Sequence, residues 1–303
     1  MVRAEVDPIL EQACQIILGK QHALELALAC FLSRGHLLIE DLPGNGKTTF
    51  SHTIAKCLGL DFKRLQFTAD LLPADVMGVN VYDSGKNHFS FHPGPIFTQF
   101  LLADEINRSS PKTQSALLEA MEEGQVTIDG HSHCLPKPFF VVATQNPLRQ
   151  IGTFPLPESQ LDRFLMRIEL GYPDHVSERR LLQGHDRRLL LEDIRALVDG
   201  NTLLAWQQQA SHVYMDAVVL DYIQNLVLAS RQQSFICGLS PRAALSLVHA
   251  AKAWAWLHGR DHVLPDDIQM LLPPVANHRL HFSAVSSEQG DPASRILHAV
   301  EAP

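Results

Sequence analysis

The segment "IEDLPGNGKTTF", residues 39–50, contains the pattern that decides the fold. It joins a short apolar run to a helical pattern through a Pro-Gly-Asn-Gly turn, which is followed by Lys47 and Thr48. Glycines allow a tight turn, and the unpaired N–H groups at the start of the next helix attract anions, so the segment predicts a phosphate-binding loop. The alternative is a surface turn that happens to contain Gly-Lys-Thr. The strand before it and the helix after it favour the phosphate loop.

The side chains of this loop have separate predicted roles. The Lys47 ammonium is expected near the outer phosphates, and the Thr48 hydroxyl is a predicted ligand of Mg²⁺. The usual motif opens with a glycine where this chain has Asp41, and that carboxylate is a mild electrostatic cost near phosphates. Whether Asp41 weakens ATP binding is open at this point. The residues predicted to bind nucleotide are Pro43, Gly44, Asn45, Gly46, Lys47, Thr48 and Thr49.

Length and composition limit the class of protein. The chain has 303 residues, of which 46% are apolar, enough for an ordinary core in about two domains. The formal net charge is −8, so the chain as a whole has no electrostatic reason to bind nucleic acid or an anionic membrane. Five scattered cysteines without a Cys-x-x-Cys pair indicate a reducing compartment. The first residues carry acids and form no basic-then-apolar leader, so we expect a soluble cytoplasmic protein.

Short apolar runs alternate with helical patterns over the first part of the chain. Residues 7–32 read as two helices, and helical patterns also cover residues 47–59 and 109–124. Such alternation predicts an α/β fold with a parallel sheet that is covered by helices on both faces. The predicted strands are residues 36–40, 62–67, 100–105, 139–146 and 163–170.

Two inserted hairpins and a C-terminal part with only helical patterns complete the predicted organisation. Residues 79–92 and 124–139 each carry alternating patterns on both sides of a turn, which predicts two inserted β-hairpins. Beyond them only helical patterns are found, so we expect a small all-helical domain after the sheet domain. The predicted boundaries are a nucleotide-binding domain over residues 1–173, a helical lid over 174–282 and a flexible, polar tail over 283–303.

Three polar residues follow predicted strands other than the first. Asp104 and Glu105 end the run "FLLADE", and Asn146 ends "FFVVATQN". At the carboxyl edge of a parallel sheet, Asp104 is placed to hold Mg²⁺, and Glu105 to polarise a water molecule against the γ-phosphate. Asn146 could orient that water, although an asparagine before Pro147 is also an ordinary turn residue. The predicted metal-binding residues are Thr48 and Asp104.

Longer motifs resemble those of one protein family. Over roughly residues 6–280, and in the same order, the chain resembles the MoxR-type AAA+ ATPases, a branch whose sheet domain carries two inserted hairpins. The motifs that carry the resemblance are "GNGKTT", "LLADEINRSSPKTQSALLEAMEEGQVTIDG", "VVATQNP", "FPLPESQLDRFLMRIELGYP", "LSPRAALSLVHAAKAWA" and "GRDHVLPDDI".

The resemblance implies further site residues. Arg163 in "LDRF" resembles the arginine finger that serves the ATP of the neighbouring subunit. Arg242 in "LSPRA" resembles the second sensor, which would reach from the lid to the γ-phosphate of its own subunit. A guanidinium suits both roles because it donates a rigid fork of hydrogen bonds to phosphate oxygens. For either arginine, the alternative is an ordinary surface residue. The segment from Ile17 to Lys20 is similar to the stretch that lines the adenine pocket, and Ile17, Leu18 and Gly19 are the predicted binding residues in it.

The resemblance also implies an activity and partners. It implies Mg²⁺-dependent hydrolysis of ATP by a ring, expected to be a hexamer, that remodels, activates or assembles a client protein in a chaperone-like role. The expected cofactors are ATP and Mg²⁺. Because this chain contains no von Willebrand factor A domain, the partner that carries one in this family is expected to be a separate polypeptide.

Other functions remain open from the sequence. A nucleic-acid motor would share the inserted hairpins, but it needs basic hairpin tips, and these hairpins offer only Lys86 and histidines. A magnesium-chelatase-like subunit is a close alternative, and a nucleotide-controlled switch with negligible turnover is a third. His131, His133 and Cys134 could bind zinc, but the sequence shows no fourth ligand near them.

Overall fold

A parallel five-stranded sheet forms the centre of the molecule, with its strands in the order β2-β5-β8-β1-β9. The computed structural model describes the chain except for residues 1, 86, 147–151, 184–186, 233–234 and 282–289. All neighbouring strands run parallel, so their carboxyl ends lie at one edge of the sheet. The predicted α/β fold is confirmed. The strands are β1 (Leu37–Glu40), β2 (Phe62–Gln66), β5 (Phe100–Asp104), β8 (Phe140–Gln145) and β9 (Met166–Ile168).

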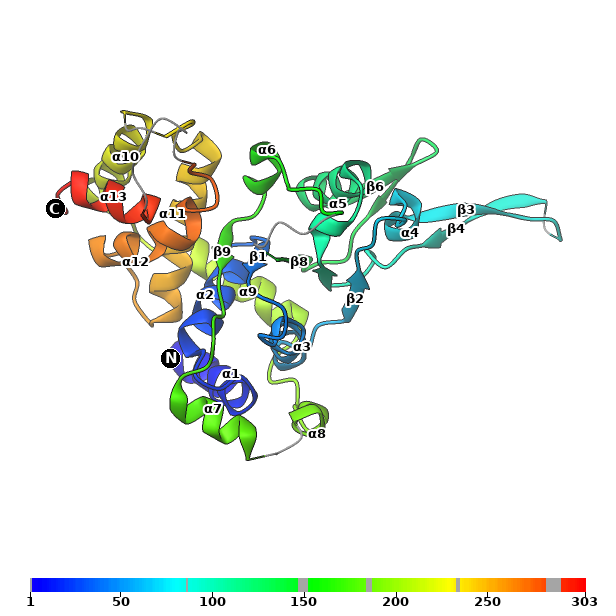
Figure 1. Cartoon of the computed structure of the whole chain (residues 1–303), viewed down its shortest axis with the longest axis horizontal. Helices are drawn as coiled ribbons and strands as arrows, with labels where there is room; N and C mark the ends of the chain where they lie inside the picture. Colours follow the sequence, from blue (N-terminus) through cyan, green and yellow to red (C-terminus); the bar gives the residue numbers. More distant parts are fainter. Residues whose placement is uncertain (1, 86, 147–151, 184–186, 233–234, 282–289) are drawn as a thin grey trace.

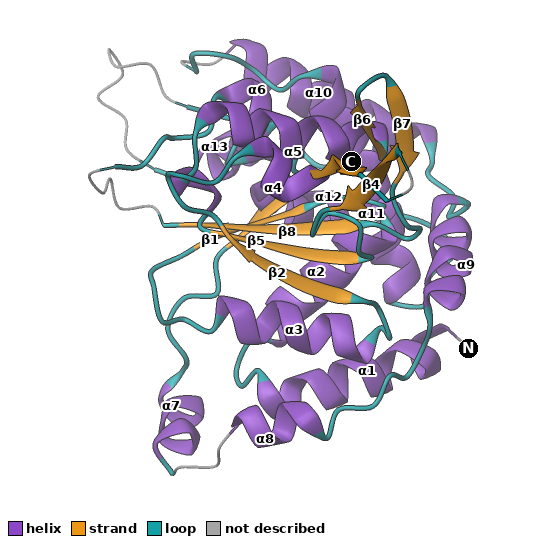
Figure 2. Cartoon of the chain, turned by 90° about the vertical axis from the view of Figure 1, so that its right-hand side faces the viewer, coloured by secondary structure: helices purple, strands orange, loops and turns teal. Residues whose placement is uncertain are grey.

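Helices cover both faces of this sheet, because successive strand residues point to opposite sides. Leu37 and Ile39 belong to one hydrophobic core, and Leu38 between them belongs to a second core. Figure 2 shows the sheet between α1 and α3 on one side and α4, α5 and α6 on the other. The helices of the first core are α1 (Val2–Ile16), α2 (Gln21–Leu32) and α3 (Lys47–Cys57). Those of the second are α4 (Pro73–Met77), α5 (Pro111–Glu123) and α6 (Glu158–Leu161).

Two antiparallel hairpins are inserted into this layered structure, as the sequence predicts. They are β3 (Gly78–Asp83) with β4 (His88–Pro93), and β6 (Gln125–Ile128) with β7 (His131–Cys134). Figure 1 shows the first hairpin projecting far from the sheet. The two hairpins contact each other: the rings of Phe91 and His133 stack with their centroids 3.9 Å apart, and Asn80 donates a hydrogen bond of 2.7 Å to Asp129. A displacement of one hairpin is therefore expected to move the other.

The zinc hypothesis for the second hairpin gains no support. His133 is engaged in its stack with Phe91. His131 and His133 lie on one side of the strand and Cys134 on the other, because successive residues of a strand alternate. Within the described residues, no group of three or more His, Cys, Asp or Glu side chains is arranged to hold a metal ion.

The helices that follow β9 form two groups. The first contains α7 (His175–Leu182) and α8 (Arg187–Glu192), which lie near α1 and α3 in Figure 1. Lys56 of α3 donates a hydrogen bond of 2.8 Å to the carbonyl of Leu191, and Gln12 of α1 donates one of 2.9 Å to the carbonyl of Arg195. The second group contains α9 (Gly200–Ser211), α10 (Ala217–Gln232), α11 (Pro241–Leu257) and α12 (Pro265–Ala276), with α11 packed against α2, α9 and α12.

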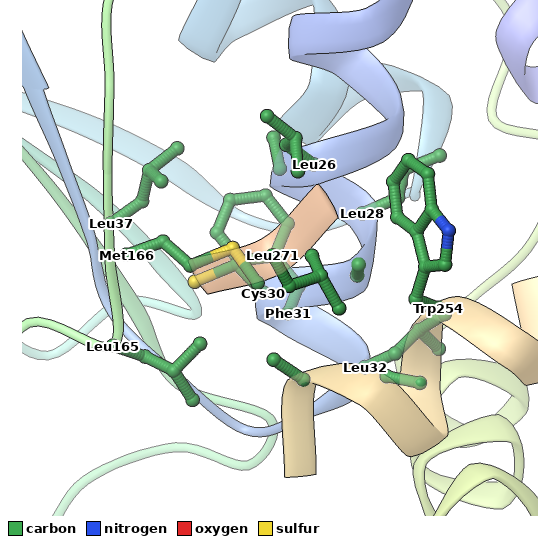
Figure 3. Packing of buried hydrophobic residues seen from close by; sticks show 14 of the residues in the cluster. Leu26, Leu28, Cys30, Phe31, Leu32, Leu37, Leu165, Met166, Trp254 and Leu271 are labelled. Atoms are coloured by element: carbon green, nitrogen blue, oxygen red, sulfur yellow. The ribbon is translucent and has the colours of Figure 1, made fainter. Parts of the chain in front are cut away.

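The second group shares its core with the sheet domain through α2. Cys30 and Phe31 of α2 are fully buried between the sheet and the C-terminal helices. Figure 3 shows them among Met166 of β9, Trp254 of α11 and Leu271 of α12. One continuous hydrophobic cluster therefore joins the C-terminal helices to the sheet.

The prediction of a flexible tail over residues 283–303 is wrong for its second half. Residues 292–299 form helix α13 (Pro292–Ala299), which packs on α10 and α12 and buries Ala293 and Ile296 completely. Asp291 caps this helix by accepting a hydrogen bond from the N–H of Ser294, and Pro292 occupies its first position. These start signals lie inside a polar stretch that suggests a loop. Residues 282–289 lie outside the described part of the chain.

None of the helices in the described part of the chain combines the length and the hydrophobicity that a bilayer crossing requires.

A partly buried histidine connects the amino edge of the sheet to α5. His36 lies just before β1, and its Nδ1 accepts a hydrogen bond of 3.0 Å from the N–H of Val141. Nδ1 is thus unprotonated, and Nε2 donates its proton to the carbonyl of Met121 at 3.2 Å. Partial burial lowers the pKa of His36 from 6.5 to about 4, against the smaller opposite effect of the Met121 bond.

This histidine predicts an acid-sensitive stability. In the unfolded chain His36 binds a proton near pH 6.5, whereas in the folded chain it does so only near pH 4. Its contribution is therefore complete above pH 6.5 and is lost as the pH falls toward 4, by up to about 3 kcal/mol. We expect the difference in unfolding free energy between the wild type and His36→Gln to shrink across this window in denaturant titrations. A constant difference from pH 7 to pH 4 would contradict this assignment.

Candidate nucleotide-binding site

The loop between β1 and α3 has the geometry of a phosphate cradle. Gly44 has φ +91° and Gly46 has φ +78°, values that side-chain-bearing residues rarely adopt. A Cβ atom at either glycine would meet no atom within 4 Å in the described part of the chain, so the space above the loop is open. The first i→i−4 bond of α3 runs from the N–H of Phe50 to the carbonyl of Gly46. The N–H groups of Lys47 to Thr49 precede this bond and are therefore available to an anion.

Lys47 lies inside this loop and close to three carboxylates. Its ammonium donates hydrogen bonds to the carbonyls of Asp41 and Leu42, the latter at 3.2 Å. Partial burial lowers the pKa of Lys47, and the charges of Asp41, Asp104 and Glu105 act in the opposite direction. The structure thus brings Lys47 near Asp104 and Glu105, as the sequence predicts.

Asp41 has a structural task that its position in the motif does not reveal. One carboxylate oxygen accepts hydrogen bonds from the Leu42 N–H at 2.7 Å and from the Asn45 amide at 2.6 Å. The other accepts from the N–H groups of Leu170 and Gly171, at 2.9 and 2.6 Å. The carboxylate is only 8% exposed and is fully used by these four donors. Asp41 therefore ties the phosphate loop to the segment that follows β9.

Asp104, the last residue of β5, is held by two neighbouring strands. Arg64 of β2 donates to one carboxylate oxygen through Nε at 3.0 Å and Nη2 at 2.7 Å. The Thr144 hydroxyl of β8 donates to the other oxygen at 2.6 Å. Both partners fix the carboxylate at the carboxyl edge of the sheet.

Glu105, the next residue, adopts an uncommon backbone conformation. Its φ of 56° lies in the left-handed region, where a residue other than glycine is strained. The Thr144 hydroxyl accepts a hydrogen bond from the Glu105 N–H at 2.8 Å. The Glu105 carboxylate accepts from the Gln66 amide at 3.0 Å and from Arg108 at 2.9 Å. Strain of this kind persists where the surroundings hold a side chain in a required direction.

The donor groups at this edge fit a magnesium ion. Mg²⁺ binds oxygen ligands, retains several water molecules and takes few protein ligands. The Thr48 hydroxyl follows Lys47 at the start of α3, and the Asp104 carboxylate lies near Lys47. In this structure the positive charge of Arg64 pairs with the Asp104 carboxylate, so this carboxylate already has a cation as its partner.

Asn146 directly follows β8 at the same edge. Residues Glu40 and Gln145 are paired across β1 and β8, and the Asp41 N–H donates to the Gln145 carbonyl at 3.2 Å. Asn146 is half-buried and lies next to this pairing, close to the start of the phosphate loop. Asn146 therefore lies at the same edge of the sheet as Asp104.

A cavity of about 210 Å³ lies beside the phosphate loop. Ile17 and Leu18 line it, as predicted, together with Gly44, Asn45, Gly46 and Thr49. The prediction for Gly19 is wrong in detail. A Cβ atom at Gly19 would lie 2.4 Å from a carboxylate oxygen of Asp174, so this glycine packs against the start of α7, whereas Lys20 of the predicted stretch does line the cavity. Pro43 is exposed and does not line the cavity. Apolar walls supplied by Ile16, Leu170 and Leu181 suit a planar base.

Arg163 and Arg242 lie together, and both pair with Glu122 at the end of α5. Arg163 Nη2 is 3.1 Å from Glu122 Oε2, and Arg242 Nη2 bonds Glu122 Oε1. The residue before Glu122 is Met121, whose carbonyl receives the hydrogen bond from His36. These contacts place both arginines at the amino edge of the sheet, where β1 begins.

The expectation that Arg242 reaches the γ-phosphate of its own subunit is therefore wrong in this structure. The phosphate loop follows the carboxyl end of β1, and four strand residues alone span about 13 Å. The start of α11 is held at the opposite edge, because the Ser240 hydroxyl donates to both carboxylate oxygens of Asp162 at 3.2 and 3.1 Å. Arg163 follows Asp162 and lies at the same edge, half-buried and outside the core.

Comparisons with known proteins identify the family. A family model described as "ATPase family associated with various cellular activities (AAA)" matches residues 36–166, and a model of the AAA lid domain matches residues 229–299. The chain is 38% identical to Chaperone MoxR1 of Mycobacterium tuberculosis, over 95% of this chain and 80% of that protein. The chain belongs to the MoxR family of AAA ATPases. It is also 44% identical to the uncharacterised protein YeaC of Bacillus subtilis, over 98% of this chain and 94% of YeaC.

A solved structure supports the same assignment for this MoxR-family chain. The crystal structure of a candidate ATPase from Cytophaga hutchinsonii matches it with a TM-score of 0.88 and 37% sequence identity. The match covers 100% of this chain and 96% of that one. This MoxR-family chain is an ATPase, and the matched AAA region, residues 36–166, contains the phosphate cradle described above.

Several residues of this site were missed by the sequence reasoning. Arg64 and Gln66 hold the two carboxylates that follow β5, and Glu122 holds the two arginines. For Arg64 and Gln66 a signal was present: they are two apart in a predicted strand, so they point to one face of the sheet. Glu122 lies in an ordinary helical pattern with no such signal.

Asp41 yields a direct test of the unusual loop. In Asp41→Gly, the N–H groups of Leu170 and Gly171 lose their acceptor, so we expect the unfolding free energy to fall by about 2–4 kcal/mol. Nucleotide affinity should also fall, because the loop loses the anchor that shapes it. Denaturant titration and titration with a fluorescent ATP analogue measure the two effects. Unchanged stability with tighter nucleotide binding would mean that Asp41 is only a repulsive charge.

Proposed function

We propose that this MoxR-family ATPase forms a ring in which each ATP site is completed by the next copy. The observation that carries the proposal is the separation of charged groups between two edges of one sheet. Lys47, Asp104 and Glu105 lie at the carboxyl edge, whereas Arg163 and Arg242 lie together at the amino edge. One chain cannot bring both edges to a single γ-phosphate. A second copy can supply its arginines to the first.

At the carboxyl edge each residue has a proposed role. Lys47 holds the outer phosphates, and Asn146 orients the attacking water. Thr48 and Asp104 hold Mg²⁺, which supplies charge neutralisation between the phosphates. Glu105 accepts a proton from the attacking water. Gln66 and Arg108 both donate to the Oε2 atom of Glu105 and so hold its carboxylate in place.

At the amino edge the arginines of one copy are proposed to face the nucleotide of the next. An arginine supplied in trans is worth about 10³–10⁵ in rate in GTPases, because it neutralises charge that develops in the transition state. We propose a hexamer as the size of the ring. The helices α9 to α13 are proposed as the lid that moves when the neighbouring site changes its nucleotide.

The cellular role is proposed from the relatives and from the hairpins. One relative is named Chaperone MoxR1, which supports a chaperone-like role for this chain. Exposed apolar side chains on the first hairpin, among them Tyr82 and Phe89, suit contact with a client protein. We propose that the protein acts in the cytoplasm with a separate partner that carries a von Willebrand factor A domain.

The proposed mechanism predicts the turnover of single variants. Glu105→Gln should retain ATP binding but lose turnover by at least about 10²-fold, because no base remains for the water. Arg163→Ala should lose turnover by about 10³-fold with little change in nucleotide affinity, because the arginine acts from another copy. Steady-state phosphate release and equilibrium nucleotide titration check the two effects. Wild-type turnover in either variant refutes the mechanism.

Mixed rings test the trans arrangement itself. Lys47→Ala copies cannot bind nucleotide but still carry both arginines, and Arg163→Ala copies have the converse defect. We expect a mixture to regain activity that neither variant has alone, since a Lys47→Ala copy can serve the ATP of its Arg163→Ala neighbour. An additive, inactive mixture would show that the arginine does not act across an interface.

The chaperone-like role predicts nucleotide-dependent retention of clients. Glu105→Gln should remain in the ATP state and keep its client, so pull-down followed by mass spectrometry should recover proteins in ATP that are absent in ADP. Lys47→Ala is the matched control, because it should retain none of them in either nucleotide. Identical recovery with ATP and with ADP would argue against a client cycle.

A further inference from the structure

Glu122 holds two arginines with one carboxylate. Its Oε2 pairs with Arg163 at 3.1 Å, and its Oε1 pairs with Arg242. The two guanidiniums come from elements far apart in sequence, the end of α6 and the first turn of α11. Two positive charges against one negative charge leave this cluster with a net positive charge. It therefore remains able to attract a phosphate group.

A buried ion pair fixes the main chain behind both arginines. Arg279, which follows α12 and whose side chain is only 4% exposed, donates through Nε to Asp162 at 2.7 Å. It also donates to the carbonyl of Phe164 at 2.7 Å. Asp162 in turn accepts from the Ser240 hydroxyl, so the residues that precede Arg163 and Arg242 are joined. The buried Arg279 and the partly buried Asp162 thus hold the main chain next to both arginines.

Glu122 has little to contribute to stability. Its side chain is 40% exposed, and exposed ion pairs contribute little because water and salt screen them. Its effect on the arrangement of the two arginine side chains is larger. Two guanidiniums close together repel each other, and a shared carboxylate between them removes that repulsion and sets their spacing. A residue with a small role in folding and a large role in side-chain direction is expected at a functional surface.

We infer that Glu122 is a positioning residue that presents Arg163 and Arg242 as one unit to the phosphates of an adjoining copy. The inference rests on the proposed ring mechanism and adds a residue to it. Glu122 touches no nucleotide itself. When the phosphates arrive, they take over from Glu122 as the partner of one or both guanidiniums, which are then already aligned.

The first test is kinetic. Glu122→Ala should lower kcat by about 10- to 100-fold, the range expected when a reacting group is displaced by about 1 Å. The affinity of Glu122→Ala for a fluorescent ATP analogue should stay within about twofold of the wild type, because the nucleotide site of the same copy is intact. The kcat of Glu122→Gln should lie between those of the wild type and Glu122→Ala, because one acceptor oxygen remains. Glu123→Gln is the matched control: it removes the same charge from the same turn of α5, and neither arginine bonds Glu123 in the described part of the chain.

The second test is the mixing of variants, which a merely structural role would not affect in this way. If Glu122 acts with the donated arginines, Glu122→Ala mixed with Lys47→Ala regains activity, because the Lys47→Ala copy carries an intact donor surface. Glu122→Ala mixed with Arg163→Ala regains none, because both copies lack that surface. If Glu122 instead served the nucleotide of its own copy, the pattern would be reversed.

The controls separate this inference from the proposed function. If Arg163→Ala and Lys47→Ala fail to complement each other, the trans mechanism is refuted, whatever Glu122 does. If they complement each other but Glu122→Ala turns over as fast as Glu123→Gln, the mechanism stands and the inference about Glu122 is overturned. A reversed mixing pattern also overturns it.

Discussion

The parallel alignment of five strands is the constraint on which the rest of this protein depends. It places the carboxyl ends of all five strands at one edge. The phosphate loop, the acidic pair at the end of β5 and Asn146 therefore lie at the same edge, although they are far apart in sequence. The same alignment collects the amino ends at the opposite edge, together with Glu122 and its two arginines. The phosphate loop and the pair of arginines thus lie at opposite edges of one sheet. Such a protomer fits a head-to-tail assembly, in which each interface joins unlike surfaces.

The electrostatics of the carboxyl edge follow from the need to balance buried charge. Each acid there has a partner of its own: backbone N–H groups for Asp41, Arg64 for Asp104, and Gln66 with Arg108 for Glu105. Unpaired, these carboxylates would be costly so close together. The partners differ in kind. Three of the four donors to Asp41 are main-chain N–H groups, whose positions the fold fixes, whereas the partner of Asp104 is the half-exposed side chain of Arg64. Asp41 is therefore part of the scaffold, whereas the proposed mechanism requires Asp104 to exchange Arg64 for a metal ion.

The sequence predicted the elements of this fold better than their mutual positions. Strands and hairpins depend on local patterns, and the structure confirms them. The place of Arg242 depends on how the lid packs, which the Ser240–Asp162 contact decides over a long sequence separation. No local pattern encodes such a contact. Helix α13 was missed for the opposite reason, because its cap and proline lie in a polar stretch while its stability comes from burial of Ile296.

The contacts at the end of α12 connect movement of the lid to the segment that carries Arg163. Arg279 and the neighbouring His278 both donate to the carbonyl of Phe164, at 2.7 and 3.0 Å. Burial lowers the pKa of His278 well below its usual range, and the Arg279 charge acts in the same direction, so this contact stays neutral and holds at physiological pH. The segment that carries Arg163 is thus bonded to the lid from two adjacent residues. A displacement of α11 and α12 must carry Arg163 with it, or else break a buried ion pair at a cost of about 3–5 kcal/mol. In the proposed ring, a change in the position of the lid would therefore also change the position of Arg163 relative to the nucleotide of the next copy.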